Sequence, residues 1–139
     1  MEAKARYHEK PWLKFYPEGV PAEISIDEYA SVADIFDQSV CRFETLPAYS
    51  NFGKTITYKE VKQFTSQLGG YLKNELGLDK GTKVAVMMPN LLQNPVAIFG
   101  ILRAGLVVVN TNPLYTSEEV QHQLSDAGAT AIIILENFA

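Results

Sequence analysis

Hydrophobic and polar positions alternate in blocks between Lys83 and Leu135, and these blocks predict a β-α-β-α-β segment. Two stretches with helical punctuation, Pro95–Ala104 and Thr116–Gly128, separate three short runs rich in β-branched residues. The runs expected to be strands are Val84–Met88, Leu106–Val109 and Ala131–Leu135. This alternation is typical of a parallel sheet with crossover helices, so the expected fold class is α/β.

The pattern before this segment predicts a helix, a hairpin and a second helix. The first helix is expected over Val32–Phe43 with Ser31 as its N-cap. The hairpin should join Ala48–Phe52 to Thr55–Tyr58 through a turn at Gly53–Lys54. The second helix should open with a capping box, Thr57 and Glu60, and end at Gly77. Its expected buried face contains Val61, Phe64, Leu68, Leu72 and Leu76, and the Gly69–Gly70 pair is expected to allow close helix–sheet packing.

Two loops follow the carboxyl ends of expected strands, Pro89–Asn94 and Asn110–Thr116. Ligands bind on that side of open α/β sheets. Residues 1–10 are expected to form a loose tail and residues 11–139 an incomplete domain, extended over its first twenty residues because three prolines interrupt them.

Composition narrows the class of protein. The chain has 139 residues, 47% of them apolar and 20% charged, which indicates a globular protein. The net charge of −4 gives no case for a nucleic-acid partner. Because there is one cysteine, no signal core and no apolar run long enough to span a bilayer, a cytoplasmic setting is expected.

Catalytic motifs are absent: the sequence has no phosphate-binding loop, no dinucleotide fingerprint and no nucleophile elbow. Cys41 is expected to be an inert, partly buried thiol, and His122 is expected to be solvated. Favourable interactions with helix dipoles account for Glu118, Glu119 and Arg103.

Four motifs in order give the chain a family resemblance: TYKE at 57–60, KGTKVAVMMPN at 80–90, FGILRAG at 99–105 and VNTNPLY at 109–115. They resemble the opening of acyl-adenylate-forming enzymes of the AMP-binding superfamily, and most closely that of bacterial long-chain fatty acid–CoA ligases. The resemblance implies that residues 11–139 belong to the large N-terminal domain of such an enzyme, as an amino-terminal fragment inactive by itself.

In that family, ATP and a fatty acid form an acyl-adenylate, and coenzyme A then takes the acyl group as a thioester. The resemblance therefore implies ATP, Mg²⁺ and coenzyme A as cofactors of the full enzyme, with none bound to this fragment. It also implies a long-chain fatty acid as substrate and peripheral association with the inner face of the membrane. The groups that hold the triphosphate and the metal lie downstream in this family.

One ligand region can be carried over from the resemblance. The coenzyme A side would be formed by Asn112, Pro113, Tyr115 and His122, whereas no catalytic or metal-binding residue is expected. A short-chain relative has an arginine for phosphate on the helix that follows this loop, and residues 119–123 contain none. An ordinary turn that ends a strand and begins a helix explains Asn112 and Pro113 as well.

Two alternatives remain open. In the first, the chain is part of another acyl or aryl adenylate-forming ligase. In the second, it is a self-contained, non-catalytic α/β binding or interaction module. Because its strands are apolar on both faces, the fragment is expected to self-associate through an exposed patch or a strand edge.

Overall fold

The computed structural model describes residues 10–139, which divide into two units at residue 30. The predicted tail therefore lies almost wholly outside the described residues. The described part of the first unit begins with a 3-10 helix, η1, over Pro11–Phe15. The expectation of a wholly extended segment is wrong here, because a proline in the first turn of a helix loses no hydrogen bond.

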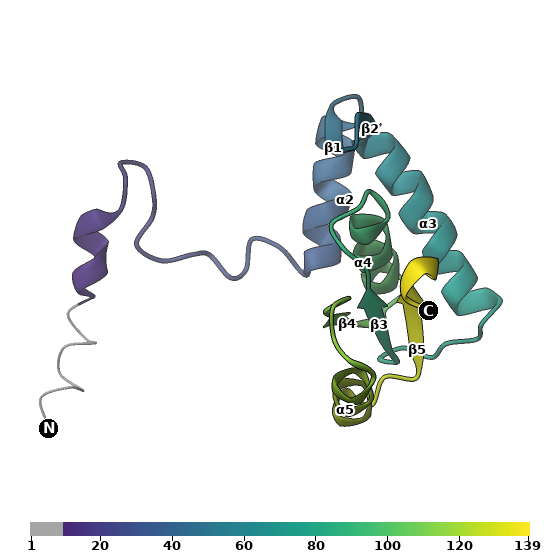
Figure 1. Cartoon of the computed structure of the whole chain (residues 1–139). Coiled ribbons are helices and arrows are strands. Elements are labelled where there is room, and N and C mark those ends of the chain that lie inside the picture. The colour runs from purple at the N-terminus through teal and green to yellow at the C-terminus, as the bar shows by residue number, and fades with distance from the viewer. Residues whose placement is uncertain (1–9) are drawn as a thin grey trace, which may run out of the picture. The chain divides into compact units, whose positions relative to one another are not determined.

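The second unit contains four helices, five strands and a final 3-10 turn (Figure 1). In chain order they are α2 (Val32–Phe43), β1 (Pro47–Asn51), β2 (Lys54–Thr57), α3 (Tyr58–Asn74), β3 (Lys83–Met87), α4 (Gln93–Arg103), β4 (Val107–Thr111), α5 (Ser117–Ala127), β5 (Ala131–Ile134) and η2 (Glu136–Phe138). The predicted fold class is confirmed.

Helix α2 and the hairpin form where the sequence predicts them. The hydroxyl oxygen of Ser31 accepts a hydrogen bond from the Asp34 amide at 3.1 Å and so caps α2. Strands β1 and β2 pair antiparallel, but the turn consists of Phe52 and Gly53 instead of Gly53 and Lys54. Both turn residues have positive φ, 46° and 75°, as a two-residue hairpin turn of this hand requires.

The predicted capping box of α3 is confirmed, as is the left-handed glycine after its end, Gly77. The predicted buried face is wrong by part of a turn, because Phe64 and Leu76 are 40% and 48% exposed. The buried residues are instead Val61, Thr65, Gly69 and Leu72. Helix α3 packs mainly against α4, and a Cβ atom at Gly69 would come within 3.1 Å of the Gly100 carbonyl oxygen. The glycine therefore serves helix–helix packing, not the predicted helix–sheet packing.

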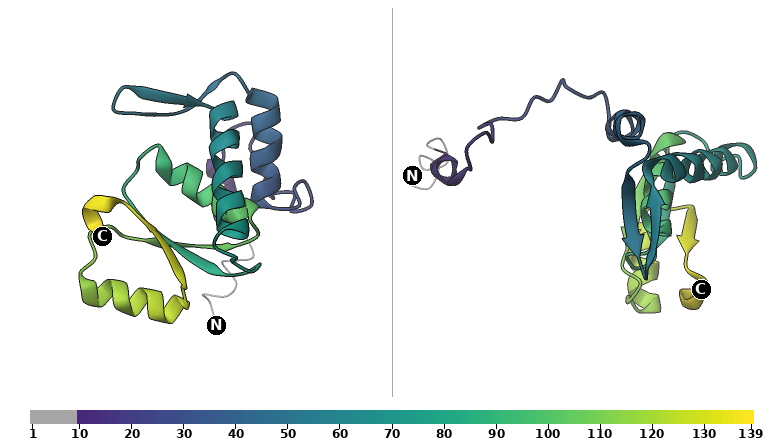
Figure 2. Two further views of the ribbon diagram at one scale, coloured as in Figure 1. Left: turned by 90° about the vertical axis from the view of Figure 1, so that its right-hand side faces the viewer. Right: turned by 90° about the horizontal axis from the view of Figure 1, so that it is seen from above.

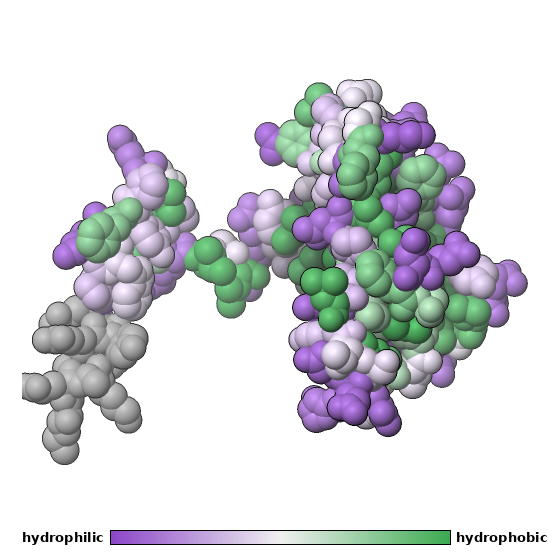
Figure 3. Space-filling model, in the orientation of Figure 1, coloured by the Kyte–Doolittle hydropathy of each residue, from purple (hydrophilic) through white to green (hydrophobic). Residues whose placement is uncertain are grey.

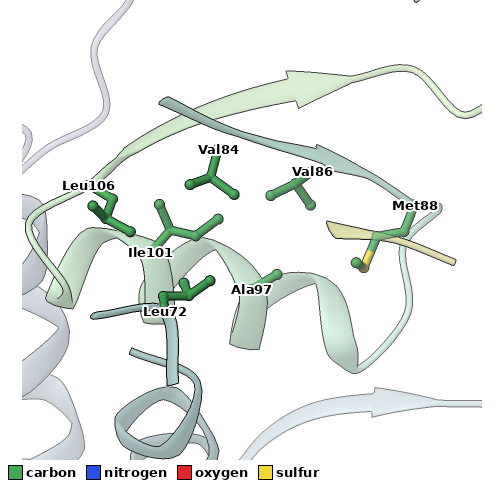
Figure 4. Close-up of a cluster of buried hydrophobic side chains, with 7 residues drawn as sticks. All are labelled: Leu72, Val84, Val86, Met88, Ala97, Ile101 and Leu106. Atoms are coloured by element: carbon green, nitrogen blue, oxygen red, sulfur yellow. The ribbon is translucent and has the colours of Figure 1, made fainter. Parts of the chain in front are cut away.

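The three later strands form a parallel sheet in the order β4-β3-β5. Strand β3 lies in the centre, and residues Val84 to Met87 are buried on both faces. Helix α4 covers one face and completes an apolar cluster with the strands and the end of α3 (Figure 4). The buried members of this cluster are Leu72, Val84, Val86, Met88, Ala97, Ile101 and Leu106.

The outer strands are less covered than the sequence predicts. Val107 in β4 and Ile132 in β5 are 43% and 40% exposed. Each of these strands has one neighbour within the described residues, and the helices do not cover all of their faces. Strand β4 also extends through Asn110 and Thr111, which the sequence places in a loop.

Arg103 joins three helices, a role that the sequence does not reveal. Its guanidinium lies 3.5 Å from Asp37 Oδ1 of α2 and donates a hydrogen bond to Thr65 Oγ1 of α3 at 3.2 Å. It also lies over the ring of Phe36 at 5.8 Å from the centroid. Arg103 on α4 thus gives the buried hydroxyl of Thr65 a hydrogen-bond partner, which explains why a polar residue is buried at this position.

Candidate functional site

The carboxyl edge of the parallel sheet is the candidate site, since both predicted loops leave from it. Met87 of β3 is in register with Thr111 of β4, and Met87 also pairs with Ile134 of β5. The loops that begin at Met88 and Asn112 therefore start side by side. The prediction that these two loops share one edge is confirmed.

The loop after β4 is stabilised by its own hydrogen bonds. The side-chain oxygen of Asn112 accepts a hydrogen bond from the Leu114 amide at 3.0 Å, and the Asn112 carbonyl accepts one from the Tyr115 amide at 3.1 Å. Thr116 then caps α5 through the predicted box with Glu119. Turn formation therefore accounts for Asn112, one of the four residues that the family resemblance places on the coenzyme A side.

A shallow hollow of about 480 Å³ runs along α5 and includes two of the four predicted site residues, Tyr115 and His122. The other residues that line it are Glu118, Glu119, Gln123 and Asp126. Asn112 and Pro113 do not line this hollow. His122 is exposed, as the sequence predicts. Figure 3 shows hydrophilic residues gathered over α5, at the bottom of the view.

The hollow carries negative charge. The backbone amide and hydroxyl of Thr116 donate hydrogen bonds to Glu119 at 2.8 and 2.9 Å, and these bonds hold the pKa of Glu119 below its usual value. A phosphate group does not fit a hollow lined by three carboxylates and one histidine, because the carboxylates would repel it. The α5 hollow therefore does not suit the phosphates of coenzyme A.

Gln123 is a further lining residue that sequence reasoning missed. Its amide nitrogen donates a hydrogen bond to the Asn110 carbonyl at 2.9 Å, and this contact ties α5 to the end of β4. Its side-chain oxygen is buried and accepts no hydrogen bond within the described residues.

A second hollow, of about 380 Å³, lies between the hairpin and the loop after β3. The Asn51 side chain donates a hydrogen bond to the Asn90 carbonyl at 3.1 Å and joins these two segments. Burial and the neighbouring Tyr58 raise the pKa of Tyr49, which lines this hollow. The lining has no charged residue and consists of Tyr49, Ser50, Asn51, Asn90, Leu91, Leu92, Asn94, Pro95, Ile98 and Phe99. The hydrophobic periodicity of the sequence does not indicate that the hairpin reaches the carboxyl edge of the parallel sheet.

The remaining candidates from the sequence do not form a catalytic group. Cys41 is exposed, and its sulfur lies 3.9 Å from Lys62 Nζ, so the prediction of a partly buried thiol is wrong. Among residues 10–139, no group of three His, Cys, Asp or Glu side chains could hold a metal ion. None of the helices in this range is both long and apolar enough to cross a membrane.

Comparison with known families gives the class of protein to which this parallel sheet and its crossover helices belong. The profile of the family described as AMP-binding enzyme matches residues 36–138. The chain therefore belongs to the AMP-binding enzyme family, as the sequence motifs predict.

Comparison with individual proteins narrows the class. The chain is 54% identical over 130 residues to a long-chain-fatty-acid–CoA ligase of Escherichia coli O6:H1, a match that covers 94% of this chain and 23% of the relative. It is 39% identical over 128 residues to the ligase of the same name from Bacillus subtilis, covering 92% of this chain and 22% of that one. The chain thus spans about a quarter of the length of the curated relatives it matches.

Solved structures support the same fold. The N-terminal subdomain of Klebsiella oxytoca NpsA superposes with a TM-score of 0.71 and 30% identity, covering 75% of this chain and 27% of that one. The anthranilate CoA ligase AuaEII in complex with anthranoyl-AMP gives a TM-score of 0.74 at 24% identity, covering 79% and 21%. The second similarity concerns the fold alone.

Proposed function

We propose that this chain forms part of a ligase that activates long-chain fatty acids with ATP and transfers the acyl group to coenzyme A. The observation that carries the proposal is the identity of 54% over 94% of the chain to a ligase of that name. The whole enzyme would use ATP, Mg²⁺ and coenzyme A. Residues 10–139 offer no cluster for the metal, so its ligands would come from elsewhere in such an enzyme.

The proposed role of this chain in ligand binding lies on the coenzyme A side of the reaction. Asn112 and Pro113 would shape the turn that presents Tyr115, and Tyr115 and His122 would contact the adenine end of coenzyme A from α5. The proposal is supported by the shared hollow of Tyr115 and His122, and repulsion from its three carboxylates would keep the phosphates outside it.

A chimera tests the proposed activity. The matching 130 residues of the E. coli relative would be replaced by those of this chain, and thioester formation from oleate, ATP and coenzyme A would be measured. We expect the chimera to retain long-chain ligase activity, because the exchange leaves the downstream groups in place. The equivalent chimera with the B. subtilis segment, which is 39% identical to this chain, is the matched control. A folded chimera without activity, beside an active control, would contradict the proposal.

Within that chimera, Tyr115→Ala and His122→Ala test the ligand assignment. Both changes should raise the KM for coenzyme A and leave ATP–pyrophosphate exchange unchanged, because exchange does not require the thiol substrate. Ser125→Ala on the exposed side of the same helix is the control. Unchanged KM in both variants would remove Tyr115 and His122 from the site.

Other substrates remain alternatives for the whole enzyme. Several structural neighbours are bound to aromatic acyl-adenylates or their analogues, and a rice 4-coumarate–CoA ligase-like protein is 31% identical over 123 residues. Activity of the native full-length protein on aryl acids, with none on oleate, would favour an aryl ligase. Absence of any adenylation by that protein would favour the non-catalytic module.

We also propose that the whole enzyme works in the cytoplasm and associates peripherally with the inner face of the membrane. The support is the proposed substrate class, since long-chain fatty acids partition into bilayers. A nucleic-acid partner is not proposed, because the net charge is −4.

A further inference from the structure

The tip of the β1–β2 hairpin has a residue that the turn itself disfavours. Phe52 occupies the first position of the two-residue turn at φ 46°, a conformation that suits asparagine or glycine and is rare for a bulky side chain. Phe52 is 92% exposed, the largest exposed fraction of any large apolar residue among residues 10–139. Neither backbone preference nor packing within the chain explains a phenylalanine at this position.

The surroundings of Phe52 differ in charge from the rest of the chain. No aspartate or glutamate occurs between Glu44 and Glu60, whereas the chain as a whole has a net charge of −4. Lys54 follows the turn and is exposed, as are Ser50 and Thr55. Figure 2 shows the hairpin extending away from the ends of α2 and α3. Asn51 joins one side of the tip to the Asn90 carbonyl, whereas Phe52 itself is exposed.

We propose that Phe52 and Lys54 form a membrane-contact tip, with the phenyl ring inserted at the boundary between headgroups and acyl chains. A stable protein interface buries about 800 Å² on each side around a cluster of apolar side chains, which a single phenylalanine on a narrow turn does not provide. A bilayer needs no complementary pocket, accepts a single aromatic side chain and attracts an adjacent lysine when it contains anionic lipid. The inference rests on the proposed peripheral association and gives that association a location.

The experiment measures cosedimentation of the 139-residue chain with phosphatidylcholine vesicles, with and without phosphatidylglycerol. We expect binding that Phe52→Asn weakens about tenfold, because the apolar contact is lost. We also expect Lys54→Glu to weaken binding mainly to the anionic vesicles. Phe52→Trp should retain binding, since tryptophan favours the membrane interface.

Two features make the experiment specific. Phe52→Asn creates the preferred Asn-Gly turn, so its melting temperature should stay the same or rise, and lost binding would not reflect unfolding. Ile24→Ser is the matched control, because Ile24 is 82% exposed but lies among Glu23, Asp27 and Glu28. It should bind vesicles as the unaltered chain does.

Three outcomes would overturn the proposal: no vesicle binding by the unaltered chain, equal binding by Phe52→Asn, or an equal loss in Ile24→Ser. Conversion of an associated species to monomer by Phe52→Asn without vesicles would instead assign the tip to self-association. Vesicle binding and the chimera's ligase activity are separate measurements, so failure of one is distinguishable from failure of the other.

Discussion

Leu68 of α3 lies so close to Gly100 of α4 that a Cβ atom at Gly100 would come within 2.9 Å of Leu68 Cδ2. The Cγ and Cβ atoms of Leu68 would follow at 3.1 and 3.2 Å, so rotation of the leucine tip alone does not relieve the contact. The two helices therefore cross at a distance that only glycine permits at this position.

Gly100→Ala should destabilise the chain. Overpacking lowers the free energy of unfolding by about 1–3 kcal/mol, and the higher helix propensity of alanine offsets up to about 1 kcal/mol of that loss. We expect a net loss of about 1 kcal/mol or more, measured as a lower urea midpoint. Gly70→Ala in α3 is the control, because its Cβ atom would meet nothing nearer than 4.0 Å. That variant should be stabilised, and equal effects of the two changes would contradict the close crossing.

Arg103→Met should lower the free energy of unfolding by about 1–3 kcal/mol, because Thr65 and Asp37 lose a shared, half-buried partner. Lys59→Ala removes a comparable ion pair at the surface, where Lys59 Nζ lies 3.4 Å from Glu44. Its effect should stay within about 1 kcal/mol. Thermal and urea unfolding of both variants would measure the difference, and equal effects would show that Arg103 does not join the helices.

The capping boxes predict a pH dependence of stability. Hydrogen bonds from Thr57 and Thr116 lower the pKa values of Glu60 and Glu119 below their ordinary value of 4.5. A carboxyl whose folded pKa is lowered stabilises the fold above its unfolded pKa, and that contribution is lost as the pH falls through the folded pKa. Glu60→Gln and Glu119→Gln should therefore be less stable than the unaltered chain at pH 7, with a gap that narrows below about pH 4.5. A gap that is constant from pH 7 to 3 would contradict this assignment.

The isolated chain should not activate fatty acids. Residues 10–139 contain no metal-binding cluster, and the sequence has no phosphate-binding loop. Pyrophosphate exchange with ATP, Mg²⁺ and oleate should equal that of a sample without protein. Exchange that depends on the added acid would show that this chain holds the triphosphate by itself.

The isolated chain should also self-associate. Strands β4 and β5 each have one neighbour in the described part of the chain, and Val107 and Ile132 expose apolar area there. An unpaired strand edge beside apolar side chains favours association. Light scattering at micromolar concentration should find a dimer or larger species. A strictly monomeric, cooperatively folding chain would favour the self-contained module.

Local signals in the sequence were sufficient for most elements. Ser31, Thr57 and Thr116 cap helices at the predicted positions, because an N-cap bond joins residues only three apart. Gly77 ends α3 with positive φ for an equally local reason. The run of buried residues in β3 was also predicted from its unbroken apolar composition.

Contacts between distant residues could not be predicted in the same way. The sequence placed Phe64 and Leu76 on the buried face of α3, whereas the crossing with α4 selected Thr65 and Gly69. The partners of Arg103 lie 38 and 66 positions away, and the acceptor on Gln123 is buried only because α5 packs beside the end of β4.

The features of the candidate site also separate into those set by local sequence and those set by tertiary contacts. The sequence determined by itself the alternation of strands and helices, the family motifs and the two loops at the carboxyl edge, because these depend on neighbouring residues and on the handedness of crossovers. Only the tertiary structure decided that Tyr115 and His122 line a common hollow with three carboxylates, and that Phe52 stands exposed at a hairpin tip. The electrostatic field and the exposure of a side chain both depend on which segments pack beside it, and no local pattern records that.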